Sequence, residues 1–159
     1  MKCGYLFYFQ FGSTLERHGD YEEAAKYFHK CLELSPNFSE ALNYLGYMWA
    51  DRGENLDEAK KLIEKAIELE PKNSAYLDSM GWVLFKLKQP REALDWMQKA
   101  IQLSGEPDPT LYDHLGDIYG GLKEFDKARD AWRKSVELEA NDRIKKKLQS
   151  APGGGGSME

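Results

Sequence analysis

The side chains that could support catalysis or metal binding are few in this sequence and stand far apart. The three histidines, His18, His29 and His114, fall in different predicted helices. The two cysteines, Cys3 and Cys31, have neither a second cysteine at CxxC spacing nor a histidine at metal-ligand spacing. No serine or cysteine stands in a nucleophile motif, and the sequence contains no glycine-rich phosphate loop. The sequence therefore predicts a protein that is not an enzyme and that uses no cofactor.

Of the three histidines, His114 is the one with carboxylates close by. Asp113 precedes it, and Asp117 follows three residues later on the same face of a predicted helix. These donors could hold a metal ion weakly. A solvated histidine is nevertheless the favoured interpretation, because metal sites of this composition are scarce. The sequence therefore predicts no metal site.

The composition predicts a soluble protein with a substantial hydrophobic core. Of the 159 residues, 42% are hydrophobic, 13% are aromatic and 31% are charged, and the formal net charge is −5. Binding to a nucleic-acid backbone requires clustered Lys and Arg. The longest basic run, Lys145–Lys147, lies near the C-terminus without interleaved aromatic residues. We therefore expect no nucleic-acid partner and interpret this run as part of a solvated last helix.

The sequence predicts neither membrane insertion nor a signal peptide. No run approaches the ~18 uninterrupted apolar residues of a membrane span. The first apolar stretch is interrupted by Gln10 and Gly12, and no small-residue cleavage site follows it. A cytoplasmic location is the default expectation, although the sequence does not fix the compartment.

The elements that carry these side chains follow a repeat of 34 or 35 residues, marked by glycines inside apolar segments at Gly12, Gly46, Gly81 and Gly116. Each glycine is followed, in the same register, by an alanine, then a large apolar residue, then a small residue. These three columns are Ala24, Ala59, Ala93 and Ala128; Phe28, Ile63, Met97 and Trp132; and Cys31, Ala66, Ala100 and Ser135. A glycine inside a helix costs about 1 kcal/mol relative to alanine. A column of glycines at one phase therefore indicates that two helices approach closely there.

The apolar periodicity predicts nine helices, at residues 4–18, 20–34, 39–52, 56–70, 74–87, 90–103, 109–121, 125–139 and 141–150. Side-chain oxygens that can cap a first turn are supplied by Asp20, Asn55 and Asp108. Pro90 and Pro109 stand at a first helical position, where the missing N–H does no harm. Two adjacent glycines, Gly120 and Gly121, should loosen the end of one helix and could mark a hinge or an engineered substitution.

This pattern resembles the tetratricopeptide repeat family over about residues 5–142, and segments 43–47 and 76–82 have the style of its bacterial members. Pro36 and Pro71 close the first two repeats. The resemblance implies an all-α, right-handed superhelical solenoid of four helix-turn-helix repeats, at about 5–38, 39–73, 74–108 and 109–142. A capping helix at 141–150 completes a domain that spans 4–150, and residues 151–159 are expected to form a flexible Gly/Ser linker or tail.

In this family the first helix of each repeat lines a concave groove that binds peptides or extended chain segments. The resemblance places the groove on Asn43, Tyr44, Tyr47, Asp78, Trp82, Phe85, Asp113, His114 and Asp117. Asp51 and Lys86 stand at further groove positions. Aromatic residues at the centre, with Tyr47 and Trp82 expected to be exposed, resemble a peptide-binding hot spot. Acidic flanks favour a ligand that carries Lys or Arg.

A second interpretation of these residues stays open. Aromatic residues at helical spacing often belong to the core between repeats, as we expect for Trp49 and Tyr119, and the acidic residues could form a solvated face. The chain also lacks the Lys, Asn and Arg clamp by which one subset of the family grips the C-terminal carboxylate of chaperone tails. Those positions hold Phe9, Ser13 and Tyr44 here, which argues against a chaperone-tail partner.

The first predicted helix is apolar nearly all round, as is normal for a buried helix. Either upstream repeats are missing, or this helix meets a second copy of the chain. The alternative function is therefore a structural unit, truncated or engineered, that self-associates through Tyr5, Phe7 and Phe9.

Overall fold

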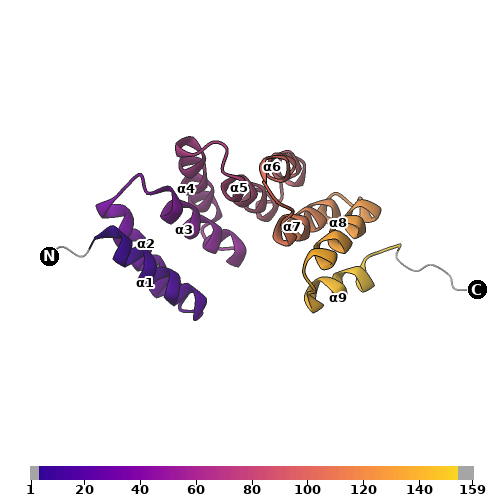
Figure 1. Ribbon diagram of the computed structural model, residues 1–159, viewed down its shortest axis with the longest axis horizontal. Helices are drawn as coiled ribbons and strands as arrows, with labels where there is room; N and C mark the ends of the chain where they lie inside the picture. The colour runs from indigo at the N-terminus through magenta and orange to yellow at the C-terminus, as the bar shows by residue number, and fades with distance from the viewer. Residues whose placement is uncertain (1–3, 154–159) are drawn as a thin grey trace, which may run out of the picture.

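The computed structural model describes residues 4–153, and within this range every regular element is an α-helix (Figure 1). The helices are α1 (Tyr5–Arg17), α2 (Tyr21–Leu34), α3 (Ser39–Arg52), α4 (Leu56–Leu69), α5 (Ser74–Lys86), α6 (Pro90–Leu103), α7 (Pro109–Gly121), α8 (Phe125–Leu138) and α9 (Asp142–Ser150). Cys3 and residues 154–159 of the expected linker lie outside the described residues. In the described range, no helix is both long and apolar enough to cross a membrane.

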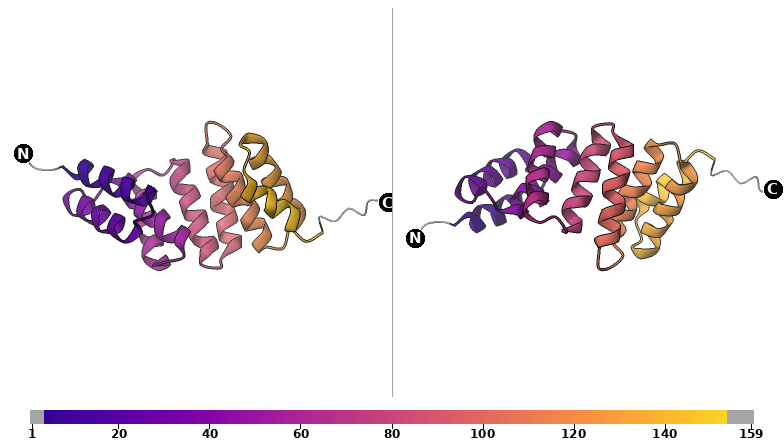
Figure 2. Two further views of the ribbon diagram at one scale, coloured as in Figure 1. Left: turned by 90° about the horizontal axis from the view of Figure 1, so that it is seen from below. Right: turned by 90° about the horizontal axis from the view of Figure 1, so that it is seen from above.

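The first eight helices form four hairpins that follow one another along the long axis of the molecule (Figure 2). The pairs are α1 with α2, α3 with α4, α5 with α6, and α7 with α8. Neighbouring hairpins also touch through their first helices, α1 with α3, α3 with α5, and α5 with α7, and α9 packs on α8. The fold is the expected all-α helical-repeat solenoid.

The helix positions agree with the sequence prediction to within one residue at each end, but two of the three predicted caps are wrong. The Asp108 side chain accepts a hydrogen bond from the N–H two residues on, as expected. Asp20 and Asn55 make no side-chain cap, whereas Asn73 and Asn141 do. A capping side chain reaches the first turn from an extended backbone. Asn55 is instead left-handed, with φ 45° and ψ 44°, and Asp20 has a ψ of 62°.

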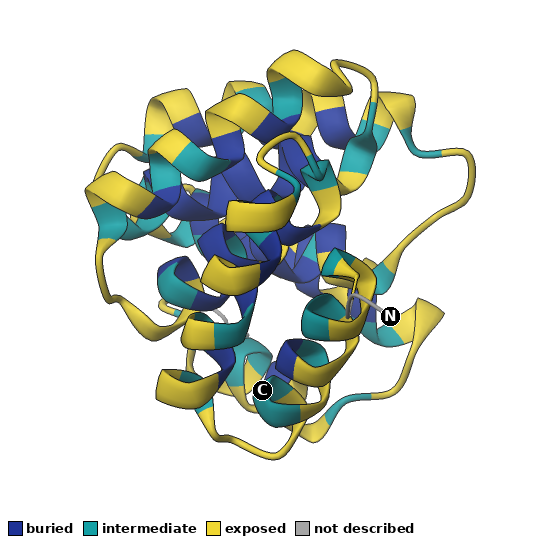
Figure 3. Ribbon diagram, turned by 90° about the vertical axis from the view of Figure 1, so that its left-hand side faces the viewer, coloured by how far each residue is buried: buried dark blue, intermediate teal, exposed yellow. Residues whose placement is uncertain are grey.

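The glycine column brings the two helices of each hairpin into close contact, as predicted. A Cβ atom at Gly46 would lie 2.7 Å from Ile63 Cγ1 and 3.0 Å from the carbonyl oxygen of Ala59. The equivalent contacts join Gly12 to Phe28, Gly81 to Met97 and Gly116 to Trp132. Buried segments face inward between the helices, and exposed segments face outward (Figure 3). The repeated glycines therefore mark the positions at which the two helices of each hairpin touch.

The paired glycines at the end of α7 also have a packing role. A Cβ at Gly121 would lie 3.0 Å from Phe85 and 3.6 Å from Pro90, so its absence lets α7 lie close to the preceding hairpin. A Cβ at Gly120 would meet Trp132 at 3.7 Å, an ordinary van der Waals distance. A side chain at position 121 would therefore press on Phe85, whereas position 120 has room for one.

Gly116 and Gly120 face the same tryptophan and provide a matched pair of substitutions. Gly116→Ala should lower the free energy of unfolding by about 1–3 kcal/mol, because the new methyl group overlaps the Trp132 ring. Gly120→Ala should raise it by up to about 1 kcal/mol, because alanine restricts the unfolded chain at a site with room for it. Urea denaturation followed by circular dichroism measures both. Equal effects of the two substitutions would contradict the close contact at Gly116.

Candidate ligand-binding groove

A cleft of about 680 Å³ opens on the side of the solenoid formed by α3, α5 and α7, and α9 forms its far wall. Of the nine predicted groove residues, five line it: Tyr47, Trp82, Asp113, His114 and Asp117. Asp51 and Lys86, at the further groove positions, line it too. The remaining wall comes from Pro109, Thr110, Ser135, Glu139, Asn141, Arg143, Ile144 and Lys147.

His114 lies at the base of the cleft and ties three repeats together. Its Nδ1 lies 2.7 Å from Asp78 Oδ1, and its Nε2 lies 3.4 Å from the hydroxyl of Tyr47. Its ring stacks on Trp82, with centroids 4.1 Å apart and planes inclined by 19°. The expectation of a solvated histidine is wrong, because only 4% of this residue is exposed. Asp78, 7% exposed, lies beneath it rather than on an open flank.

The charge on His114 is set by two opposing effects. Burial by itself lowers the pKa of the imidazole, but the carboxylate of Asp78, followed by those of Asp113 and Asp117, outweighs burial and raises the pKa above its ordinary value. The folded state therefore favours the protonated ring more than the unfolded chain does. The contact between His114 and Asp78 connects α5 to α7.

Trp82 is also less open than predicted, with only 6% of the residue exposed. His114 stacks on the ring, and Phe85 lies 5.3 Å away from it in a second stacked arrangement. The indole Nε1 donates a hydrogen bond to Asp51 Oδ1 at 3.1 Å, and the Lys86 ammonium lies 4.9 Å from the ring centroid. A ligand can therefore reach the edge of this tryptophan, with Asp51 and Lys86 beside it.

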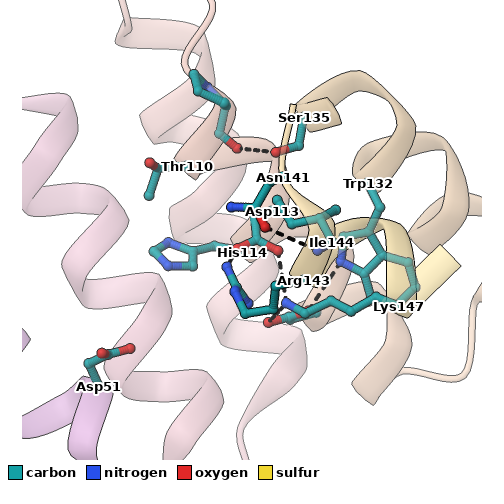
Figure 4. A network of polar contacts seen from close by, with 12 residues as sticks. Asp51, Thr110, Asp113, His114, Trp132, Ser135, Asn141, Arg143, Ile144 and Lys147 are labelled. Carbon is teal, nitrogen blue, oxygen red and sulfur yellow. Dashed lines mark hydrogen bonds and ion pairs between the residues drawn. The ribbon is translucent and has the colours of Figure 1, made fainter. Parts of the chain in front are cut away.

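Two cations from α9 reach the carboxylates of α7 across the cleft (Figure 4). Arg143 donates to Asp113 Oδ2 at 2.7 Å, and Lys147 donates to Asp113 Oδ1 and to Asp117 Oδ1, each at 2.8 Å. Although burial raises the pKa of the Asp113 carboxyl, the hydrogen bonds from Lys147 and Arg143 hold it below its ordinary value. The acidic flank is thus largely neutralised from within the chain.

Arg143 and Lys147 were not among the predicted groove residues, since α9 was expected only to solvate the end of the solenoid. The helix α9 also covers the end of the solenoid, because Ile144 is buried against Ala128 and Trp132 of α8. The spacing contains a usable indication: the two cations are four residues apart on α9, as Asp113 and Asp117 are on α7.

The other predicted groove residues lie outside the cleft lining. Phe85 packs on Trp82, and Tyr44, 44% exposed, packs against Phe9 at 5.2 Å, towards the N-terminal end. Asn43 is half-buried, and among the described residues its buried Oδ1 has no hydrogen-bond partner. The predicted core residues Trp49 and Tyr119 are partly buried against the core.

The residues proposed for self-association divide into two groups. Tyr5 and Phe9 are half-buried and each packs against Phe38, with ring centroids 5.1 Å apart. Phe7 is 52% exposed, and it shares its surface with Leu6 and Phe11, which are 50% and 41% exposed. The exposed apolar face of α1 therefore consists of Leu6, Phe7 and Phe11.

Residues 4–153 contain no group of three His, Cys, Asp or Glu side chains arranged to hold a metal ion. Cys31 is buried between helices, and burial raises the pKa of its thiol to about 11. This thiol is protonated at neutral pH and its role is packing.

Comparison with known proteins identifies the repeats. Profiles of the tetratricopeptide repeat match residues 9–74, 50–109 and 109–142. No curated protein sequence matches the chain. A solved structure of MamA from Desulfovibrio magneticus RS-1, from residue 41 to the end, is 26% identical, with a TM-score of 0.72 over 93% of this chain and 83% of that one. A thermophilic TPR protein of Thermus thermophilus is 20% identical, with a TM-score of 0.81 over 89% of this chain and 77% of that one.

The raised pKa of His114 predicts a pH-dependent stability. A group with a raised folded-state pKa contributes fully below its unfolded pKa and loses that contribution as the pH rises through the folded value. The free energy of unfolding should therefore fall as the pH rises from about 6.5, the ordinary histidine pKa, into the alkaline range. Urea denaturation across this range should show the fall in the wild type and in His29→Gln, since His29 is exposed, but not in His114→Gln. An unchanged fall in His114→Gln would show that another group is responsible.

Proposed function

Because the chain belongs to the tetratricopeptide repeat family, whose solenoids are protein-interaction scaffolds and typically not enzymes, we propose that the cleft between α3, α5, α7 and α9 binds a segment of a partner protein. The observation that carries the proposal is the cleft itself. The cleft has a volume of about 680 Å³, and its walls carry the aromatic side chains of Tyr47 and Trp82 together with several charged groups. Its volume lies in the range of ligand sites, and its lining is richer in charged and hydrogen-bonding groups than is usual for small-molecule pockets, which suits a polar segment of protein chain.

The exposed carboxylate of Asp51 favours a segment that carries Lys or Arg. Asp51 is exposed on the α3 wall (Figure 4), and one of its oxygens accepts from Trp82. A carboxylate has further acceptor positions, so it can also bind an incoming cation. The half-buried ring of Tyr47, one turn before Asp51 on α3, can attract the same kind of group. The partner segment therefore places a basic residue at Asp51, with its neighbours over Tyr47.

Replacing the exposed carboxylate tests this proposal. Asp51→Asn keeps an oxygen acceptor for Trp82 but removes the charge, so affinity for Lys- and Arg-containing peptides should fall about fivefold to tenfold. The matched control is Asp95→Asn, an exposed aspartate on α6 outside the cleft. Fluorescence anisotropy with a library of labelled basic peptides gives the affinities. Absence of binding by the whole library, or equal losses in the two variants, would refute a basic ligand in the cleft.

A second function, self-association through α1, is supported by the exposed apolar face of Leu6, Phe7 and Phe11. Phe7 and Phe11 lie with their rings nearly parallel, 6.2 Å apart, and form a continuous surface. Exposed clusters of large apolar side chains are typical of protein–protein contact sites. On this proposal, a second copy of the chain covers the face.

Light scattering over a range of concentrations tests self-association. The wild type should show a mass that rises with concentration, and Leu6→Gln with Phe7→Gln should abolish the rise because both substitutions place polar groups on the contact surface. Leu103→Gln, at an exposed leucine on α6, is the control and should leave the rise unchanged. A wild-type protein that is monomeric at every concentration would exclude this function.

A further inference from the structure

The contact between α9 and α7 has the form of a bound ligand. Asp113 and Asp117 stand one helical turn apart on α7, and Arg143 and Lys147 stand one turn apart on α9. The two cations meet the two carboxylates through four hydrogen bonds of 2.7–3.0 Å. One helix thus presents to the groove the basic side chains that we expect of a partner.

Packing on α8 and ion pairs to α7 hold α9 in place. It has nine residues, and helices shorter than about 12 residues are marginal on their own. Within it, Ile144 is buried, while Leu148 is only partly packed on α8. The Arg143 side chain is 62% exposed, so its ion pair contributes less to stability than the two pairs of Lys147, whose side chain is 23% exposed. After the helix, Arg129 donates one hydrogen bond, of 2.7 Å, to the carbonyl of Pro152.

We propose, on the basis of the groove function above, that α9 is an exchangeable occupant of the groove and that the partner segment is a basic amphipathic helix that replaces it. The partner helix carries two cations one turn apart, each followed by an apolar residue, as Arg143–Ile144 and Lys147–Leu148 are arranged in α9. Its cations take the places of Arg143 and Lys147 on Asp113 and Asp117. Its first apolar residue takes the place of Ile144 against Ala128 and Trp132.

Displacement of α9 changes the charge of the groove. With α9 bound, Asp113 and Asp117 are paired within the chain, and Asp51 remains as an exposed carboxylate on the opposite wall. With α9 released, all three carboxylates face the partner. The affinity measured for a basic helix is then its intrinsic affinity reduced by the fraction of chains in which α9 is open.

The chain offers a matched control on the same helix. Lys145 and Lys146 are exposed, and within the described residues neither forms an ion pair with the α7 carboxylates, which bind Arg143 and Lys147. Two double variants are compared: Arg143→Glu with Lys147→Glu, and Lys145→Glu with Lys146→Glu. Both change the net charge by the same amount, but only the first places negative charges opposite Asp113 and Asp117.

The probe is a labelled peptide with the sequence of residues 139–151, titrated into the full chain and followed by fluorescence anisotropy. The Arg143→Glu, Lys147→Glu chain should bind it at least about tenfold more tightly than the wild type, because the internal competitor is repelled. The Lys145→Glu, Lys146→Glu chain should bind like the wild type. Equal affinities for all three chains, or equal gains in both variants, would overturn the proposal.

A measurement on the wild type covers the case in which the first variant does not fold. In the ¹⁵N-labelled chain with saturating unlabelled peptide, the amide resonances of α9 should move to unstructured positions while those of α8 remain dispersed. Peptide binding with α9 still folded on α7 would overturn the proposal. A dimer of the wild type that the peptide dissociates would identify the occupant as α9 of a second copy, and would likewise overturn the choice of a separate partner.

The two proposals fail in different ways. If no basic peptide of the library binds, or if Asp51→Asn has no effect, the groove function itself is wrong. If peptides bind and respond to Asp51→Asn, but neither the α9 variants nor the α9 resonances respond, then α9 is a fixed wall of a functional groove.

Discussion

The close approach of two helices at a position without a side chain is the contact on which the rest of this molecule depends. At Gly46, Ile63 occupies the space that a Cβ would need, and the same arrangement recurs once in each hairpin. The contact fixes the depth to which a second helix packs on the first, and so fixes the surface that the first helix leaves for the next hairpin. Stacking then follows, because a single hairpin cannot bury its apolar face alone.

The cleft is a product of this stacking, and polar contacts set its final shape. The stacked rings of Trp82 and His114, the buried Asp78 and the hydroxyl of Tyr47 connect α3, α5 and α7 at the base of the cleft. A buried ion pair keeps its partners in one arrangement, because either charge alone would be costly to bury. The floor of the groove is thus joined across three helices by side-chain contacts, whereas its far wall is the nine-residue helix α9.

The sequence predicts the helices well because apolar periodicity and glycine spacing are local properties. The groove residues were placed by the resemblance to the repeat family, and five of them, Tyr47, Trp82, Asp113, His114 and Asp117, line one cleft. The sequence does not predict their burial. Asp78 and His114 are 36 residues apart, and their pairing depends on how two hairpins stack. The prediction of caps at Asp20 and Asn55 was wrong because both are suitable residue types but neither has the extended backbone that a cap requires. The inward role of α9 was missed because one sequence shows which face of a helix is basic, not which carboxylates lie opposite.

Trp132 takes part both in the helix contact of the fourth hairpin and in the hydrogen bonds of the groove. Its ring occupies the glycine slot of the fourth hairpin, and its Nε1 donates a hydrogen bond of 3.1 Å to Asp117, a groove carboxylate that also binds Lys147. Ile63 and Met97, which fill the same slot in the second and third hairpins, have no such donor. The four repeats are therefore not interchangeable modules: transplanting the second or third hairpin into the fourth position would preserve the fold pattern and remove a hydrogen bond from the groove.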